Sequence, residues 1–237
     1  MYRVFLSILV LVIVDIGCGK IVDKHKCPDV RSVPHFDLTR MLGKWYVIEY
    51  YDSDVEALSY RCMESVFING DHVVGPDGKI EYTPAVTMNY TYQYIDDPLM
   101  EFLQGNITWK IDMNDPGHWT HTEEYYNDIY NTYVTDIVYD DWALLVHCAE
   151  ESKRVQDGAR YLTAFMLSRK TTLAKNVLAY LTDKLKRYGV DVNYVFPVKH
   201  DEQCEPSRNR TSGVQYPYYY GVNDPKFIKR INDLNDE

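Results

Sequence analysis

The sequence predicts an all-β protein, and three observations support this. Between residues 45 and 167, short runs rich in β-branched and aromatic residues follow one another. Turn sequences of hairpin length separate these runs, for example Asn69-Gly70-Asp71 and Asn114-Asp115-Pro116-Gly117. A single amphipathic helix follows the last long run. About eight or nine strands joined in this way form the meander of an up-and-down barrel or a sandwich, and a single domain of this kind can hold the whole chain.

An entry segment precedes the strands. Residues 20–42 contain Cys27, Pro28 and Pro34, and residues 36–42 can form one helical turn before Gly43. The Asn-Gly pair at 69–70 tolerates the positive φ angles of a tight turn, so a hairpin is predicted there. The predicted strands are residues 45–51, 62–68, 80–83, 86–95, 100–111, 118–126, 129–138, 142–149 and 160–167.

A helix is predicted over residues 171–188, where apolar residues recur at roughly four-residue steps and form one stripe: Leu173, Val177, Leu181, Leu185 and Tyr188. Thr171 or Thr172 can cap its start, and Gly189 suits its end. A lone helix after so many strands is expected to bury its stripe on the outside of the sheet. Residues 190–198 are predicted as a further strand. Residues 205–237 show no periodicity and are predicted to form a disordered, tyrosine-rich tail.

The composition excludes some classes of function. The chain has 25 Lys and Arg against 35 Asp and Glu, a formal charge of -10, which argues against nucleic acid and anionic membranes as partners. The 22 tyrosines suggest inner surfaces that carry rings with polar ends.

The first nineteen residues have the pattern of a secretory signal. Arg3 supplies a basic start, residues 4–14 are apolar, and Gly17-Cys18-Gly19 offers small residues for cleavage. The apolar run is short for a membrane span, which makes a retained anchor the weaker alternative, and no later stretch could span a bilayer. The expected organisation is a signal at 1–19, a barrel domain at 20–204 and the tail at 205–237.

Removal of the signal leaves four cysteines, Cys27, Cys62, Cys148 and Cys204. An even number in a secreted chain implies two disulfides, and the spacing does not choose among the three pairings. Three sequons, at Asn89, Asn106 and Asn209, predict glycosylated surface positions and agree with secretion.

Three short motifs carry a resemblance to a known family. Gly43-Lys44-Trp45, Thr135-Asp136 before a strand that ends in Cys148, and Ser168-Arg169 before the helix resemble, in order and spacing, the signatures of the lipocalin family. The resemblance covers roughly residues 27 to 204 and looks closest to insect lipocalins and apolipoprotein D. The second signature departs from the pattern, because Ile137 replaces a tyrosine and Tyr139 lies nearer.

The resemblance implies an eight-stranded antiparallel up-and-down barrel with one C-terminal helix outside and a binding cup within. It also implies that Cys27 pairs with Cys148 and Cys62 with Cys204. Gly43, Trp45, Thr135, Asp136 and Arg169 are expected to be structural. We expect the Arg169 guanidinium to lie on the Trp45 ring and close the barrel floor.

No catalytic constellation is present in the sequence, so we expect a protein that is not an enzyme and has no metal or cofactor. His118 and His121, three apart on a strand, point to opposite faces and could not easily share an ion. Asp96-Asp97 and Asp140-Asp141 are assigned to solvated turns. Neither a Gly-x-Ser-x-Gly motif nor a phosphate loop occurs.

Strand parity suggests which residues face the lumen. Counting back from Arg169 places Leu167, Phe165, Thr163 and Tyr161 on one face, and counting from Cys148 places Leu145 and Ala143 together. On the middle strands the register leaves either parity open. The predicted ligand-lining residues are Tyr92, Phe102, Trp109, Tyr125, Tyr133, Leu145, Thr163 and Phe165.

The favoured function is a secreted carrier of a small hydrophobic molecule, such as a lipid, fatty acid, retinoid, steroid, pheromone or bilin. One alternative is a secreted interaction or scaffold protein whose surface or tail binds a partner or receptor. Another is an amine or haem scavenger, for which Glu49 and His147 are the candidate lumen residues. Tyr51 and the loops after it are expected to form the rim of the cup.

Overall fold

The computed structural model describes residues 23–54, 60–74, 77–97, 101–123 and 128–204. The predicted signal at 1–19, the tail at 205–237 with the Asn209 sequon, and Tyr125 lie outside these residues.

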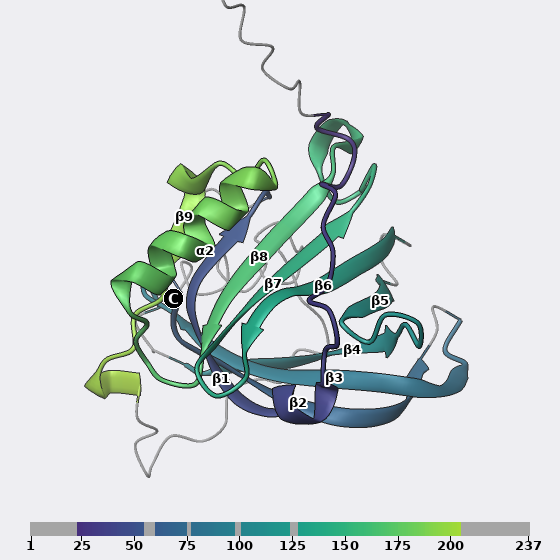
Figure 1. The fold of residues 1–237 in the computed structure, drawn as a ribbon, viewed down its shortest axis with the longest axis horizontal. Coiled ribbons are helices and arrows are strands. Elements are labelled where there is room, and N and C mark those ends of the chain that lie inside the picture. Colours follow the sequence, from purple (N-terminus) through teal and green to yellow (C-terminus); the bar gives the residue numbers. More distant parts are fainter. Residues whose placement is uncertain (1–22, 55–59, 75–76, 98–100, 124–127, 205–237) are drawn as a thin grey trace, which may run out of the picture.

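Eight antiparallel strands close into a barrel (Figure 1). Each strand pairs with the next in the chain from β2 to β8, and β1 closes the cylinder by pairing with both β8 and β2. The strands are β1 Gly43–Asp52, β2 Tyr60–Val74, β3 Ile80–Tyr94, β4 Leu103–Ile111, β5 His118–Glu123, β6 Asp128–Val138, β7 Trp142–Ala149 and β8 Tyr161–Ser168. The sequence-predicted all-β barrel is confirmed.

The helical elements lie outside the cylinder or at its ends. They are α1 Leu38–Met41, α2 Lys175–Arg187 and three 3-10 turns, η1 Gln156–Gly158, η2 Val192–Tyr194 and η3 Glu202–Cys204. Helix α2 covers the outer face of β7 and β8, where Leu181 and Leu185 are buried against Leu144 and Met166 (Figure 1). In the part of the chain that the structure describes, no helix has the length and apolar character needed to cross a bilayer.

Helix α2 starts later than the sequence predicts. Neither Thr171 nor Thr172 caps it, and Ala174 occupies the N-cap position. The reason lies in Ser168, whose hydroxyl donates to the Thr172 carbonyl and accepts from the Lys170 N–H, so the first residues after β8 form a tight link instead of a helical turn. The end agrees with the prediction, since Gly189 has a φ of 71°.

The hairpin predicted at Asn69-Gly70-Asp71 is wrong. Strand β2 runs on to Val74, and its register against β3 shifts between Gly70 and His72, which marks a bulge. A Cβ at Gly70 would lie 3.3 Å from the Ala85 Cβ, so the glycine serves a close strand approach. The connection falls instead between Val74 and Ile80, and the predicted strands 80–83 and 86–95 are one strand.

The segment predicted as a strand over 190–198 is mostly not one. It contains η2 and only the short β9 Val195–Pro197, which nevertheless completes the barrel wall. Strand β1 pairs with β2 only from Gly43 to Tyr46, and beyond that point β9 lies beside β1. Lys199 then bridges to Arg61 on β2. The C-terminal segment therefore fills the space where β1 and β2 diverge.

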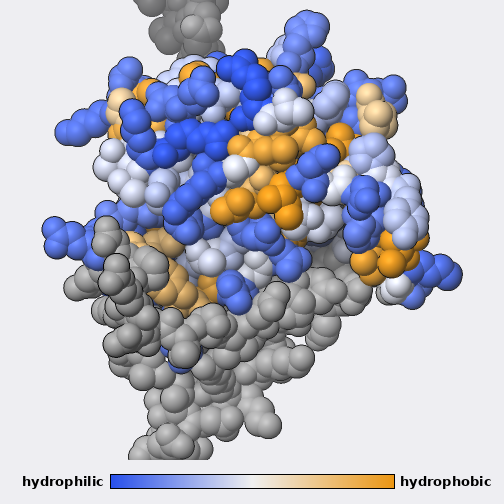
Figure 2. All heavy atoms as spheres, turned by 90° about the horizontal axis from the view of Figure 1, so that it is seen from below, coloured by the Kyte–Doolittle hydropathy of each residue, from blue (hydrophilic) through white to orange (hydrophobic). Residues whose placement is uncertain are grey.

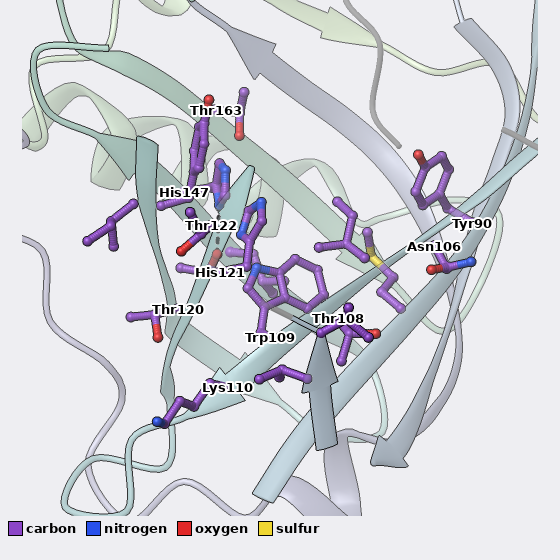
Figure 3. Close-up of a pocket in the computed structure, with 18 of the residues that line it drawn as sticks. Tyr90, Asn106, Thr108, Trp109, Lys110, Thr120, His121, Thr122, His147 and Thr163 are labelled. Carbon is purple, nitrogen blue, oxygen red and sulfur yellow. Dashed lines mark hydrogen bonds between the residues drawn. The ribbon is translucent and has the colours of Figure 1, made fainter. Parts of the chain in front are cut away.

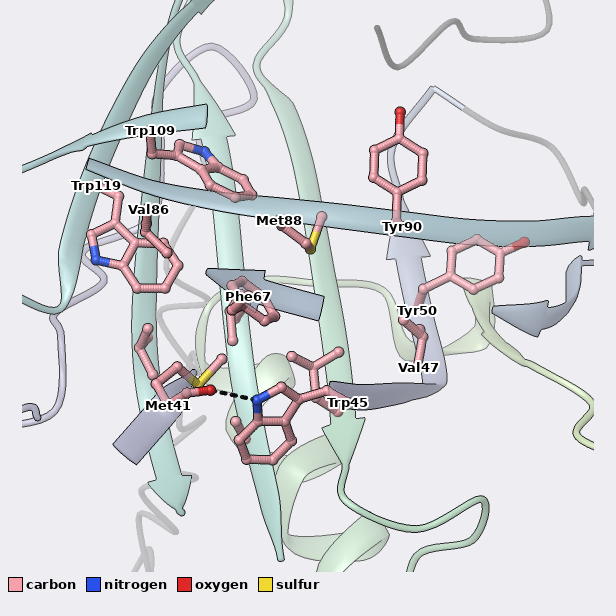
Figure 4. Close-up of a cluster of buried hydrophobic side chains, with 14 of the residues drawn as sticks. Met41, Trp45, Val47, Tyr50, Phe67, Val86, Met88, Tyr90, Trp109 and Trp119 are labelled. Atoms are coloured by element: carbon pink, nitrogen blue, oxygen red, sulfur yellow. Dashed lines mark hydrogen bonds between the residues drawn. The ribbon is translucent and has the colours of Figure 1, made fainter. Parts of the chain in front are cut away.

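The floor of the barrel is packed with aromatic rings (Figure 4). Trp45 is fully buried, and its indole N–H donates to the Met41 carbonyl at 2.7 Å. The rings of Trp109 and Trp119 lie 5.7 Å apart between centroids, and Phe67 lies 6.1 Å from Trp119. This packing closes one end of the cylinder with side chains.

Two disulfides are present, Cys27–Cys148 and Cys62–Cys204. This is the pairing that the resemblance implied. The first attaches the entry segment to β7, and the second attaches the C-terminal segment to β2.

The Thr135-Asp136 pair connects β6 to the outer helix. The Lys184 ammonium group donates to the Thr135 carbonyl and to the Asp136 carboxylate, both at 2.8 Å. The Tyr180 hydroxyl donates to the same carboxylate at 2.5 Å. Asp136 thus anchors α2 on the barrel through two polar contacts.

Candidate functional site

A cavity of about 490 Å³ lies inside the barrel above the packed floor (Figure 3). Five strands contribute to its apolar wall, which includes Met63, Met88, Trp109, Leu145 and Phe165. Polar side chains reach the same space, among them His121, His147 and Thr163. The site therefore combines an apolar wall with numerous hydrogen-bonding groups, and the charged side chains of Glu81, Lys110 and Arg154 also line it.

Strands β7 and β8 place four of these side chains. Their register is regular, with Leu145 opposite Phe165 and His147 opposite Thr163. Directly opposed residues of an antiparallel pair share a face, so all four point into the lumen. Their outward neighbours, such as Val146 and Ala164, pack under α2.

Two histidines form the polar centre of the cavity. The rings of His121 and His147 stack with centroids 5.2 Å apart, and Tyr130 stacks on His147 at 5.0 Å. The His147 Nδ1 shares a hydrogen bond of 2.7 Å with the Thr132 hydroxyl. The buried Nδ1 of His121 has no hydrogen-bond partner among the described residues. A bound molecule can satisfy it.

Burial keeps both imidazoles neutral. It lowers the pKa of His121 to about 4, and it lowers the pKa of His147 well below the ordinary value, with further contributions from His121 and Arg154. A neutral imidazole both donates and accepts hydrogen bonds. The pair can thus orient a polar group of a ligand without supplying a net charge.

A second polar network lies where β1 ends and β8 begins. The Tyr161 hydroxyl donates to the Asp52 carboxylate at 3.0 Å. The Arg154 guanidinium lies 4.3 Å from the centroid of the Tyr161 ring and donates to Asp54 at 3.2 Å. Burial raises the pKa of Asp52 to about 6, although hydrogen bonds from Asp54 and Tyr161 act in the opposite direction. Arg154 and Tyr161 both line the cavity.

Four of the predicted lining residues line the cavity, namely Trp109, Leu145, Thr163 and Phe165. Tyr92 lies next to it instead, in a cluster of rings where its centroid is 5.1 Å from Tyr60 and 5.3 Å from Tyr94. Its neighbour Tyr90 lines the cavity (Figure 3).

Phe102 and Tyr133 do not line the cavity. Phe102 precedes β4, and the buried residues of that strand are the odd-numbered Leu103, Gly105, Trp109 and Ile111. Tyr133 lies on the outer face of β6, opposite Val146, where it stacks on His118 at 4.5 Å. The cavity lining contains neither residue, and Tyr133 points away from the lumen.

His118 and His121 point to opposite faces of β5, as the sequence predicts. His121 nevertheless lines the cavity, although the sequence pattern suggests for it only one half of a metal pair. The signal was present, because His121 shares strand parity with the fully buried Trp119. Among the described residues, no group of three or more His, Cys, Asp or Glu side chains is arranged to hold a metal ion.

Glu49 lies outside the lumen, which corrects the prediction for this residue, and the side chain of Tyr51, which was predicted for the rim of the cup, also lies on the outer face. The register of β1 against β8 shifts between Val47 and Glu49, and this bulge reverses the parity counted from Trp45. Glu49 consequently lies opposite Met166 on the outer face, and Tyr51 packs in the outer cluster beside α2. Tyr50 faces inward in their place.

The two described sequons lie on neighbouring strands. Asn89 on β3 and Asn106 on β4 are directly opposite each other in the register. Asn89 is exposed and Asn106 is half-buried. Asn106 also lines the cavity, whereas Asn89 does not.

A closed eight-stranded antiparallel barrel with a packed floor, an internal cavity and one outer helix defines the lipocalin-like fold. Solved structures of that architecture resemble the chain. Apocrustacyanin C1 matches with a TM-score of 0.56 and 16% sequence identity, covering 77% of this chain and 93% of its own. Lobster apocrustacyanin A1 matches with a TM-score of 0.55 and 16% identity, covering 79% and 96%. No protein-family model and no curated sequence matches. At 16% sequence identity, the similarity to these structures shows the shared fold alone.

Proposed function

We propose that the protein is a secreted carrier that binds a small, mainly apolar molecule in the barrel cavity. The observation that carries the proposal is the cavity of about 490 Å³, in which neutral histidines lie among apolar walls. Its volume is within the range of small-molecule sites. Affinity would come from burial of apolar surface, and orientation from hydrogen bonds to His121 and Thr163.

The cavity favours a neutral polar group on the ligand over a charged amine. The imidazoles carry no charge at neutral pH, and Glu49, the acidic residue expected to face an amine, lies on the outer face. A ligand with a hydroxyl, carbonyl or protonated carboxyl group fits these donors and acceptors. Lipids, retinoids, steroids and bilins all contain such groups.

Secretion rests on several agreeing features. The chain has a signal-like start, two disulfides and sequons on the outer face of the barrel. The four-cysteine arrangement resembles that of insect lipocalins and apolipoprotein D. The apocrustacyanins share its fold.

The test is to purify the secreted protein from its native source and identify the organic extract by mass spectrometry. A Leu145→Trp variant is designed to fill the cavity, and Tyr133→Phe, on the outer face, is its control. We expect Leu145→Trp to weaken binding of the compact apolar probe N-phenyl-1-naphthylamine by about tenfold or more, with Tyr133→Phe unchanged. An empty extract together with no probe binding by the folded wild type would refute the carrier.

The histidines favour one second candidate, a haem scavenger. A neutral imidazole is the form that binds haem iron, and the buried Nδ1 of His121 has no hydrogen-bond partner in the described chain. A visible absorbance spectrum after titration with haem tests it. A Soret shift that His121→Phe abolishes would favour this candidate, and an unchanged haem spectrum would exclude it.

A further inference from the structure

The barrel wall is incomplete between β4 and β5. Within their described residues, these strands pair only at Lys110–Thr120 and Ile111–Trp119. On its other side β5 pairs with β6 from His118 to Glu123, and β4 pairs with β3 from Leu103 to Lys110. The two strands thus separate just beyond the floor, although each is firmly held by its other neighbour.

The cavity passes through this separation. Its lining includes the inward residues Ile107, Trp109 and His121. It also includes outward residues of the same two strands, which are Asn106, Thr108, Lys110, Thr120 and Thr122. Alternate residues of a strand point to opposite faces, so one cavity can be lined by both faces only if it runs between the strands. Figure 3 shows Trp109 and His121 from the two strands facing each other, with Lys110 and Thr120 farther out.

Two rings stand at the inner end of the opening. Trp109 and His121 meet edge to face, with ring centroids 6.0 Å apart and an interplanar angle of 89°. The Trp109 indole N–H, like the His121 Nδ1, is buried and has no hydrogen-bond partner in the described part of the chain. These two groups are available to the polar end of a molecule that passes between them.

Apolar side chains lie at the outer end. Val74, near the tip of the β2–β3 hairpin, is 58% exposed, and Ile129 on β6 is 64% exposed, and both line the cavity. Lys110 forms an ion pair with Glu81 beside them. Figure 2 shows apolar side chains near the centre of one face and at its right-hand edge, the side toward which the hairpin projects in Figure 1. Exposed apolar residues at a cavity mouth suit a ligand that extends beyond it.

The separation of β4 and β5 differs from the other separation in the barrel wall, which lies between β1 and β2. Those strands also diverge, but β9 fills the space between them and Cys62–Cys204 holds the filling segment in place. In the residues that the structure describes, nothing comparable lies between β4 and β5.

We propose that the separation between β4 and β5 is a lateral doorway, and that the ligand is an elongated apolar molecule with one polar end. The polar end lies at His121 and His147, and the apolar tail leaves between Thr108 and Thr122 to contact Val74 and Ile129. This inference rests on the proposed carrier function and specifies its ligand class.

The test closes the doorway with a disulfide. If the ladder continued in register from Lys110–Thr120, Thr108 would face Thr122, so the variant is Thr108→Cys with Thr122→Cys. Because Thr108 belongs to the Asn106 sequon, the variant, its control and the reference protein all carry Asn106→Gln. The matched control is Ile68→Cys with Thr87→Cys, across an outward-facing pair of β2 and β3 that is already closed and does not line the cavity. Disulfide formation is checked by mass, and folding by circular dichroism. The probes are cis-parinaric acid, which is long and linear, and the compact N-phenyl-1-naphthylamine.

We expect the disulfide between positions 108 and 122 to slow release of cis-parinaric acid about tenfold and to weaken its binding. The same disulfide should have little effect on binding of the compact probe, and the control variant should release both probes as the reference protein does. If this disulfide does not form, the variant Thr122→Trp is used in its place, because a tryptophan there would block the outer end of the doorway. Release of cis-parinaric acid should again be slower. Unchanged release of cis-parinaric acid from a folded, closed variant would overturn the doorway and leave the carrier function standing. Wild type that binds neither probe would instead refute the carrier function.

Discussion

The guanidinium carbon of Arg169 lies 3.7 Å from the centroid of the Trp45 ring. The same group donates hydrogen bonds to backbone carbonyls of Tyr139, Lys44 and Leu42, at 3.0, 2.8 and 3.1 Å. One side chain thereby joins the start of β1, the β6–β7 turn and the end of β8. Because Trp45 is fully buried below it, Arg169 covers the floor of the barrel from outside.

Replacing Arg169 with leucine is expected to destabilise the protein without abolishing ligand binding. The variant loses the cation–π contact and leaves several carbonyls without a donor, a cost of about 2–4 kcal/mol. Thermal and urea unfolding measure the loss. Arg40→Leu is the control, since the Arg40 guanidinium also lies on a ring, 4.2 Å from the centroid of Tyr139, but its side chain is 55% exposed, so its loss should change stability by less than about 1 kcal/mol. Equal melting temperatures for wild type and Arg169→Leu would contradict this role.

The fold was predictable because its markers are local. Gly43-Lys44-Trp45 and Ser168-Arg169 are each runs of consecutive residues, so they can be recognised in the sequence without knowledge of the fold. The lining of β7 and β8 was also predictable, since their ladder runs without a bulge from Trp142–Ser168 to Ala149–Tyr161 and simple alternation holds.

The inward face of the second half of β1 and the true end of β2 could not be predicted because bulges depend on tertiary packing. The shift between Val47 and Glu49 accompanies the exchange of β2 for β9 beside β1, a partner more than a hundred residues away. The bulge at Gly70 likewise extended a strand that its Asn-Gly sequence appeared to end. Neither partner can be read from the neighbouring sequence.

Mild acid is expected to destabilise the protein through the cavity histidines. Burial lowers the pKa of His121 from 6.5 to about 4, so the unfolded chain binds a proton below pH 6.5 that the folded protein does not. The contribution of the neutral His121 ring to the free energy of unfolding is fully present above pH 6.5 and is lost as the pH falls toward 4. It amounts to about 3 kcal/mol for His121.

Urea unfolding of wild type and His121→Phe between pH 7.5 and 4.5 checks this. The variant should lose less stability across that range. His72→Gln, on a side chain that is 48% exposed, serves as the control and should follow wild type. Parallel pH profiles for wild type and His121→Phe would exclude the histidine as the cause.

Asp52 should have the opposite pH dependence. Burial raises its pKa from 3.8 to about 6, so the folded protein favours the protonated carboxyl. That stabilisation is fully present below pH 3.8 and is lost as the pH rises through 6. Asp52→Asn should therefore raise the free energy of unfolding at pH 7.5 by about 1–2 kcal/mol, less than the full shift implies because asparagine keeps only one acceptor oxygen. At pH 4 the variant and wild type should agree. Asp29→Asn, on an exposed carboxylate, controls for net charge.

The sequons provide a matched pair for testing access to the cavity. Asn89 and Asn106 face each other across β3 and β4, but only Asn106 lines the cavity, at the side where β4 separates from β5. A glycan on Asn106 would therefore stand at the lateral doorway, whereas one on Asn89 would lie one strand farther from it. In protein secreted from a eukaryotic host, we expect Asn106→Gln to speed release of cis-parinaric acid several-fold, while Asn89→Gln leaves it unchanged.

Glycopeptide mass spectrometry establishes occupancy of both sites first. If both are occupied and the two variants release the probe at the same rate, the ligand does not pass beside Asn106. A glycan can slow release only if it stands beside the route by which the ligand leaves the cavity. Equal rates would therefore show that the opening between β4 and β5 is not that route.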